Sequence, residues 1–155
     1  AFLYVLRQND VAFDDGDIES VMKIWWDLSP FEDVVPALEK LSKRFKLVAL
    51  SNGDPKYLNH IARVRIGFDW DDVISCTAAG VFKPHPAVYR HAARELGLEP
   101  GQISMVAAHG FDVMGARACG YRGVYVNRYG LPFEETPYQP DVTVQDFAGL
   151  AEALS

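Results

Sequence analysis

Polar and charged side chains follow three apolar stretches of the sequence, and together they suit the binding of a small anion. Ser51 and Asn52 end the stretch "KLVALSN", Lys83 stands in "FKPHP" after the next predicted strand, and Asp112 ends "VAAHGFD". Hydroxyl, amide and ammonium groups donate hydrogen bonds to an anion, and a carboxylate orients water or binds a metal ion. The combination therefore predicts a small-anion site with an acid beside it.

Each of these residues also has an ordinary structural interpretation. Ser51 and Asn52 could form a turn before a helix, and Asp112 could cap the helix that follows it. Lys83 could be a solvated loop lysine. His109 stands three residues before Asp112. Its imidazole could position water or accept a proton near neutral pH, or it could only bond a neighbouring carbonyl group, and the sequence leaves both interpretations open.

Alternating strands and helices must position these residues. Apolar runs bounded by turn residues predict strands, and apolar residues at helical spacing predict helices between them. The predicted strands span residues 46–52, 72–76, 103–108, 123–127 and 141–144, and the predicted helices span residues 55–64, 86–96 and 111–119, followed by a last helix. This order is typical of an α/β fold with a doubly wound parallel sheet covered by helices on both faces. The carboxyl ends of its strands form one edge, where ligands bind in such sheets.

The first part of the chain differs, because it is helical throughout. The stretches "AFLYVLRQ" and "IESVMKIWWDL" have apolar residues at helical spacing, and "VVPALEKLSKRF" predicts a third helix after the break at Pro30. The composition changes near residues 28–33. We therefore expect two parts, a helical part over residues 1–31 and an α/β part over residues 32–155.

Composition restricts the partners of the protein. The chain has 15 basic and 21 acidic residues, a net charge of −6, and no dense cluster of Lys and Arg, so we expect no nucleic-acid partner. No apolar run approaches the length of a membrane span, so we expect no membrane partner. Cys76 and Cys119 lack metal-type spacing and fit a reducing compartment. These features favour a cytoplasmic protein.

The three polar strand ends lie in longer motifs that resemble a known group of proteins. The stretches "LVALSNGDP", "FKPHPAVYRHAARELGL" and "MVAAHGFDVMGARACGYRGVYVNR" resemble, in this order, the second, third and fourth motifs of the haloacid dehalogenase superfamily. Within it the chain is most similar to the type II L-2-haloacid dehalogenase-like proteins, from about Ala1 to the C-terminus. The separations also suit the family: 32 residues from Ser51 to Lys83 and 29 from Lys83 to Asp112.

The resemblance implies a HAD-like, Rossmann-type parallel sheet and hydrolysis without a cofactor. In the family, an aspartate on the first strand attacks the halogen-bearing carbon, and water then hydrolyses the resulting ester. This sequence contains no Asp-x-Tyr-Gly-Thr type motif. The resemblance therefore predicts a member without its nucleophile strand, with a remnant of the helical cap in residues 1–31 and the core in residues 32–155. We interpret Asp14, Asp15 and Asp17 as acids at a helix N-terminus rather than as a replacement nucleophile.

The resemblance also assigns roles to the polar residues. Ser51 and Lys83 would bind the substrate carboxylate and keep the nucleophile ionised. Asp112 would orient or activate the hydrolytic water. Tyr89 would be a partner for the lysine or the substrate, although it could equally be a helix residue that packs on the sheet.

Asn52 and Phe111 match the positions that hold the leaving halide in dehalogenases, since an amide donor and an aromatic edge both suit an anion. The fourth motif departs from the family pattern. Ala107, Ala108 and His109 stand where dehalogenases commonly have Ser-Ser-Asn. We therefore include His109 among the candidate catalytic residues, as a group that positions water beside the acid.

Three functions remain open from the sequence. The first is a hydrolase that acts on a short 2-halocarboxylate without a metal. The second is a phosphatase of the same superfamily, in which Asp112 would bind Mg²⁺ and a phosphate ester would be the substrate. Gly110 and Phe111 occupy the positions where such enzymes usually offer a second acid. The third is a truncated chain without catalysis, which would be a fragment or an assembly module.

A missing central strand would leave two neighbouring strands with unpaired edges, which invite pairing with another chain. We therefore expect a homo-oligomer, formed by strand or helix exchange across a two-fold axis. The alternative is a rearranged sheet in which the N-terminal helices of residues 1–27 pack in the place of the missing strand.

Overall fold

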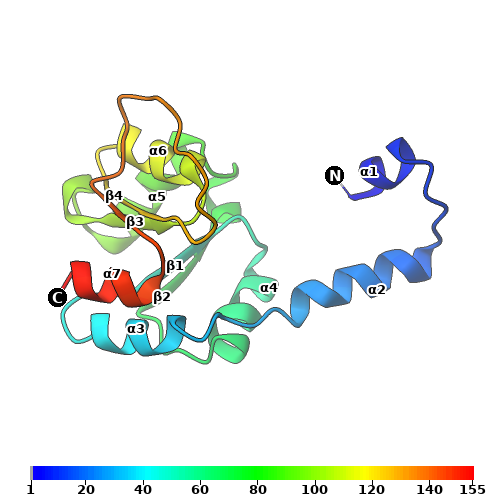
Figure 1. Cartoon of the computed structure of the whole chain (residues 1–155), viewed down its shortest axis with the longest axis horizontal. Helices are drawn as coiled ribbons and strands as arrows, with labels where there is room; N and C mark the ends of the chain where they lie inside the picture. The colour runs from blue at the N-terminus through cyan, green and yellow to red at the C-terminus, as the bar shows by residue number, and fades with distance from the viewer. Residues whose placement is uncertain (1) are drawn as a thin grey trace.

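The computed structural model describes residues 2–155 and shows an α/β body with an extended helical arm (Figure 1). Ala1, the first residue of the predicted helical part, lies outside the described residues. The strands are β1 (Val48–Ser51), β2 (Asp72–Ser75), β3 (Ser104–Ala107), β4 (Arg122–Val126) and β5 (Val142–Val144). The helices are α1 (Phe2–Gln8), α2 (Asp15–Trp26), α3 (Val34–Leu41), α4 (Pro55–Asn59), η1 (His60–Arg65), η2 (Cys76–Ala79), α5 (Pro86–Leu96), η3 (Pro100–Gln102), α6 (Gly110–Ala118) and α7 (Phe147–Ala153).

All of the strand pairs are parallel, which confirms the predicted α/β class. The strands form two separate sheets, β1–β2 and β3–β4–β5. Within residues 2–155, no strand precedes β1, and β1 and β3 share no backbone ladder. Each of these two strands therefore has one edge that no described strand pairs with, as the missing first strand predicts.

Helices cover both faces of the three-stranded sheet, because its side chains alternate between two apolar clusters. One cluster lies under α3 and α7 and is built around Val124 and Leu150. The other lies under α5 and α6 and is built around Met105 and Tyr121. Leu50 of β1 packs against this second cluster, so side-chain packing joins the two sheets where backbone hydrogen bonds do not.

The helices α1 and α2 form an arm that projects away from the body (Figure 1). No residue of α2 is buried, and its side chains Met22, Ile24 and Trp25 are all at least half exposed. The alternative in which residues 1–27 pack in the place of the missing strand is therefore wrong. That alternative followed from the strand edges that a missing strand leaves unpaired, yet the apolar side chains of α2 stay exposed instead of covering those edges.

Local interactions explain how the arm forms and how it joins the body. Asp14 and Asp17 form a reciprocal capping box at the start of α2, which agrees with their interpretation as helix N-terminal acids. At the other end, the ring of His60 hydrogen-bonds the carbonyl oxygen of Trp26 at 3.0 Å. Arg65 donates to the carbonyl groups of Asp27 and Leu28. The helix end is thus fixed to η1 by its own carbonyl groups.

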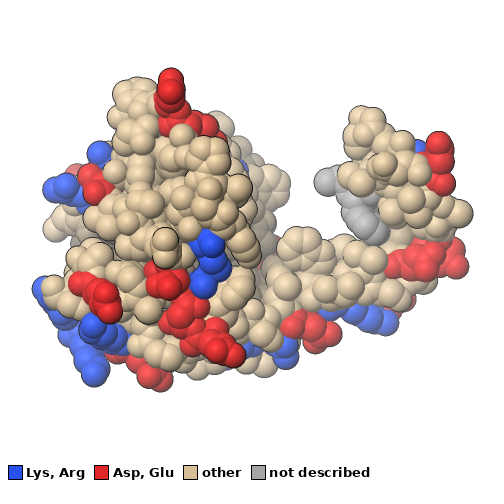
Figure 2. Space-filling view, in the orientation of Figure 1, with Lys and Arg blue, Asp and Glu red and all other residues tan. Residues whose placement is uncertain are grey.

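The surface carries both signs of charge. On the face shown in Figure 2, Lys and Arg form small groups separated by acidic and uncharged side chains, and the upper side of α2 is largely uncharged. None of the helices in residues 2–155 has the length and apolar character needed to cross a membrane.

Asp33 joins three elements that are distant in sequence. Its carboxylate accepts a hydrogen bond from Arg128 at 2.6 Å and from the backbone N–H of Phe147 at 2.8 Å. The guanidinium of Arg128 also lies over the ring of Phe31, 4.2 Å from its centre. The hydrogen bond from Arg128 lowers the pKa of Asp33 below 3.8, its ordinary value. This carboxylate therefore connects the start of α3, the start of α7 and the segment after β4.

The depressed pKa of Asp33 predicts a pH-dependent contribution to stability. The contribution is complete above about pH 4 and is lost as the pH falls through the folded-state pKa, because protonation removes the charge that Arg128 binds. We expect Asp33→Asn to lower the free energy of unfolding at pH 6, because it removes the negative charge that Arg128 and the Phe147 N–H bind. The difference from the wild type should shrink toward zero near pH 2.

Urea denaturation at both pH values measures this difference. Asp69→Asn is the matched control, because Asp69 is fully exposed and 3.8 Å from Arg63, and it should change stability by less than about 0.5 kcal/mol. An equal loss for Asp33→Asn at both pH values would contradict the assignment.

Candidate functional site

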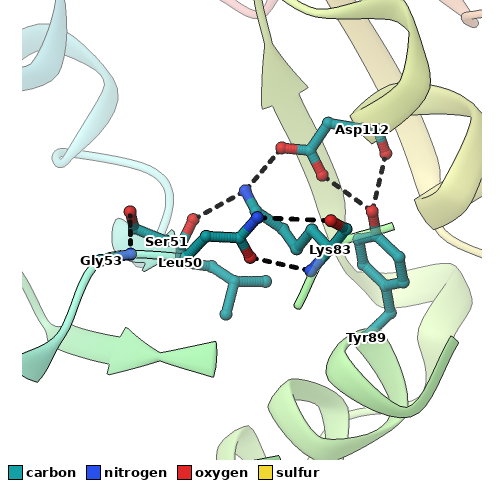
Figure 3. A network of polar contacts seen from close by, with 7 residues as sticks. Leu50, Ser51, Gly53, Lys83, Tyr89 and Asp112 are labelled. Atoms are coloured by element: carbon teal, nitrogen blue, oxygen red, sulfur yellow. Dashed lines mark hydrogen bonds and ion pairs between the residues drawn. The ribbon is translucent and has the colours of Figure 1, made fainter. Parts of the chain in front are cut away.

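The centre of the site is an ion pair between Lys83 and Asp112 (Figure 3). The Lys83 Nζ atom lies 2.5 Å from Asp112 Oδ2 and donates a second hydrogen bond, of 2.9 Å, to the carbonyl oxygen of Leu50. Both side chains are nearly buried, with exposed fractions of 11% and 8%. The interpretation of Lys83 as a solvated loop residue therefore does not hold. A charge pair with so little water around it is expensive to break.

Asp112 lies in the first turn of α6, at the carboxyl end of β3. A carboxylate is favourable there because the helix N-terminus carries partial positive charge. Its second oxygen, Oδ1, accepts a 2.9 Å hydrogen bond from the hydroxyl of Tyr89. Tyr89 comes from α5 and is completely buried. Burial, reinforced by the negative charge of Asp112, raises the pKa of Tyr89 far above its ordinary value, so this hydroxyl is a donor at all ordinary pH values.

Ser51 and Asn52 follow β1 on the same edge. The Asn52 Oδ1 atom accepts a 2.8 Å hydrogen bond from the backbone N–H of Lys83, and its Nδ2 atom donates to the Lys83 carbonyl oxygen at 3.3 Å. These two bonds fix which way the amide points. The Ser51 hydroxyl oxygen accepts a bond from the N–H of Gly53 at 3.1 Å. The structure thus brings Asn52 into contact with the lysine segment, and it places Ser51 beside Leu50, whose carbonyl group binds Lys83.

His109 and Phe111 lie at the start of α6 and are more exposed. Phe111 is 43% exposed, and the two rings are 5.5 Å apart between their centres. His109 occupies the N-cap position, but its side chain makes no capping hydrogen bond.

Two surface hollows, of about 320 and 420 Å³, lie between α3 and the C-terminus and beside the end of α5, and neither is lined by any of the candidate residues. In the part of the chain that the structure describes, no group of three or more His, Cys, Asp or Glu side chains could hold a metal ion. Asp112 thus accepts hydrogen bonds from two side chains. Among the described residues, it does not belong to a group of acids that could bind a metal ion.

Two features of the site could not be read from the sequence. The Leu50 carbonyl group is a ligand of Lys83, yet a backbone atom carries no sequence signal. The second feature is the role of Tyr121. Its hydroxyl donates a 2.7 Å hydrogen bond to the carbonyl oxygen of Tyr89 and so helps to hold Tyr89 in place. A tyrosine in an otherwise apolar stretch is only a weak indication of such a bond.

The sequence pattern of the haloacid dehalogenase-like hydrolases matches residues 3–120. The chain is 32% identical over 146 residues to haloacetate dehalogenase H-2 of Moraxella sp. (strain B), across 93% of this chain and 65% of that protein. It is 36% identical over 156 residues to an (S)-2-haloacid dehalogenase of Pseudomonas sp. (strain YL), across 98% of this chain and 66% of that protein. Among solved structures, the L-2-haloacid dehalogenase RSc1362 superposes with a TM-score of 0.92 at 30% identity, across 97% of this chain and 67% of that one.

These matches define the class of the protein, which has an α/β fold of the haloacid dehalogenase type. The chain belongs to the haloacid dehalogenase-like hydrolase family. It spans slightly less than two thirds of the length of the two curated relatives, at 65% and 66%.

The buried ion pair predicts a large and specific effect on stability. We expect Lys83→Met to lower the free energy of unfolding by about 3 kcal/mol, because it leaves the Asp112 carboxylate buried without its cation. Chemical denaturation at pH 7 measures this loss. Lys56→Met, at an exposed lysine of α4, is the control and should be nearly neutral. Equal stability of the two variants would contradict the buried pair.

Proposed function

We propose that this chain carries the substrate-binding half of a haloacid dehalogenase site, which acts on a short 2-halocarboxylate through an aspartyl ester. The observation that carries the proposal is the Lys83 ammonium group, held at the carboxyl edge of the strands by Asp112 and the Leu50 carbonyl. The names of the two curated relatives support the substrate class, since both are haloacid or haloacetate dehalogenases.

Lys83 and Ser51 are the proposed ligands of the substrate carboxylate. An ammonium group has three N–H donors, and two of those of Lys83 bind Asp112 and Leu50, so one remains for an anion. The Ser51 oxygen accepts from Gly53, which leaves the hydroxyl proton of Ser51 to be donated. Together these two donors match a carboxylate, and the lysine also favours the ionised form of a nearby acid.

Asn52 and Phe111 are the proposed halide ligands. One N–H of the Asn52 amide donates to the Lys83 carbonyl oxygen. Asn52 is exposed, so its second N–H remains to bind an anion from solution. The exposed ring of Phe111 can offer its positive edge to an anion. A halide leaving the substrate would then be stabilised by two weak donors rather than by a full positive charge.

Asp112 and His109 are the proposed water-handling groups. Asp112 is fixed at both oxygens, so it would hold the hydrolytic water in one orientation for attack on the ester. His109 lies one helical turn before it, at the exposed start of α6, where its imidazole can hydrogen-bond water.

The nucleophile of such a reaction is not among the acids placed at this site. Asp112 is engaged with Lys83 and Tyr89, and Asp14 and Asp17 cap a helix of the arm. We therefore propose that residues 1–155 alone bind the substrate but do not turn it over, because covalent catalysis needs a carboxylate that attacks carbon.

The Mg²⁺-dependent phosphatase alternative fits the described residues less well. Mg²⁺ needs several oxygen ligands in octahedral geometry. Asp112 offers its two oxygens to Lys83 and Tyr89, and Gly110 and Phe111 supply no second carboxylate.

Binding and turnover test the proposal separately. We expect bromide and 2-chloropropionate to shift the backbone NMR signals of Asn52 and Phe111, and Asn52→Ala to weaken binding of both by about tenfold. Asn59→Ala, on the adjacent helix α4, is the control and should not change the affinity. Anion-induced shifts confined to other parts of the chain would overturn the halide assignment.

Ion chromatography of halide released from 2-chloropropionate or chloroacetate, and phosphate release from p-nitrophenyl phosphate, measure turnover. We expect none above the uncatalysed rate from the purified chain. Halide release that is lost in Asp112→Asn would refute the need for a separate nucleophile.

We also propose that the chain forms homo-oligomers through the strand edges of β1 and β3. The support is that neither edge is paired by a described strand, and exposed edges associate readily. We expect light scattering to give a mass that rises from 17.3 kDa toward twice that value with concentration, and amide protection of β1 and β3 to rise in parallel. Ile24→Lys, on the exposed arm, should leave this unchanged. A mass of 17.3 kDa at every concentration would refute the proposal.

A further inference from the structure

Gly115 occupies an unfavourable place for a glycine, in the interior of α6. Glycine destabilises a helix interior relative to alanine, because it loses more backbone freedom on folding. Several glycines of this chain have a positive φ that explains them, such as Gly97 and Gly120, but Gly115 is not among these. Its backbone conformation therefore permits any residue, and the reason for a glycine must be the space around it.

That space is filled by the site. A Cβ atom added at Gly115 would lie 2.6 Å from the hydroxyl oxygen of Tyr89 and 2.9 Å from the Cε2 atom of the same ring. It would also lie 2.9 Å from the Cβ atom of Pro84, the residue that follows Lys83. Real Cβ atoms do not tolerate such distances, so either the ring and the proline or the helix would have to move.

The Tyr89 ring has little freedom to yield. It is completely buried, its hydroxyl is 2.9 Å from Asp112 Oδ1, and its carbonyl oxygen is held by the hydroxyl of Tyr121 at 2.7 Å. The rings of Tyr89 and Tyr121 also meet edge to face, with 6.0 Å between their centres. A group at position 115 would therefore push mainly on the hydroxyl end of Tyr89, where the bond to Asp112 is made.

We propose that Gly115 is a positioning residue of the site: its lack of a side chain lets the Tyr89 hydroxyl reach Asp112, so that Tyr89 and Lys83 together hold that carboxylate in a single orientation. The meaning of this orientation for water attack rests on the proposed function, but the geometry itself does not. Gly115 contacts no reacting group and acts through Tyr89. Because the same Cβ would meet Pro84, the lysine side of the carboxylate depends on Gly115 as well.

Three variants of the 155-residue chain test the proposal: Gly115→Ala, Tyr89→Phe and the pair together. The first readout is the hydroxyl proton of Tyr89, which should give a slowly exchanging NMR signal in the wild type because it is buried and bonded. We expect Gly115→Ala to accelerate its exchange at least tenfold. Gly101→Ala is the matched control, because a Cβ at Gly101 meets nothing within 4 Å, and it should leave the signal unchanged. An unchanged signal in a folded Gly115→Ala chain would overturn the proposal.

The second readout is the affinity for 2-chloropropionate. We expect Gly115→Ala to weaken binding at least as much as Tyr89→Phe, because the new Cβ also meets Pro84 beside Lys83. The double variant should be no weaker than Gly115→Ala alone, since the Tyr89 bond is already lost in that variant. Additive losses would overturn the route through Tyr89. If the wild type binds no 2-chloropropionate, the proposed function fails, and the hydroxyl signal alone then decides the role of Gly115.

A stability measurement covers the case in which Gly115→Ala does not fold. In the Tyr89→Leu background, the hydroxyl oxygen and Cε2 atom that meet the new methyl group are absent. We expect Gly115→Ala to lower the folding equilibrium constant at least tenfold less in this background than in the wild type. An equal effect in both backgrounds would show that Tyr89 is not what the glycine accommodates.

Discussion

The ion pair between Lys83 and Asp112 is the contact that joins the two halves of the carboxyl edge. Lys83 follows the β1–β2 sheet, and Asp112 follows β3 of the other sheet. The two sheets share no backbone hydrogen bonds, so their relative position depends on side chains. Lys83 also holds the Leu50 carbonyl group, and the Leu50 side chain packs into the cluster under α5 and α6. The Lys83–Asp112 ion pair and the packing of Leu50 thus both join the two sheets. Burial strengthens the ion pair, because the local dielectric constant is low.

Asp33 performs a comparable task beyond the ends of β4 and β5. It precedes α3, and it binds Arg128 after β4 and the N–H of Phe147 at the start of α7. Asp33 and Asp112 are both largely shielded from water, with exposed fractions of 21% and 8%, and each carboxylate is bonded by more than one donor. Carboxylates suit this task because one group accepts several hydrogen bonds from different elements at once. The chain therefore compensates for a divided sheet with acids that each connect several elements.

Local sequence signals predicted an element well where residues that begin and end a helix mark both of its ends. The helix of residues 86–96 was predicted with its observed ends, because Pro86 begins it and Gly97 ends it in a left-handed conformation. The helix predicted for residues 55–64 instead changes to wider turns at residues 60–65, where the ring of His60 binds the end of α2. The order of strands was enough to place Lys83 and Asp112 on one edge of the sheet. It could not show that the two side chains pair directly and are nearly buried, because that depends on how the segments around them pack.

The fixed carboxylate of Asp112 limits what it can do in a reaction. An ionised carboxylate has about four lone-pair positions, of which Lys83 and Tyr89 use two. The remaining positions can accept hydrogen bonds from water while the group itself cannot rotate. A nucleophile must approach carbon along one direction and leave its partners as it does so, which a carboxylate bonded at both oxygens resists. The arrangement therefore suits a group that orients water better than one that attacks carbon.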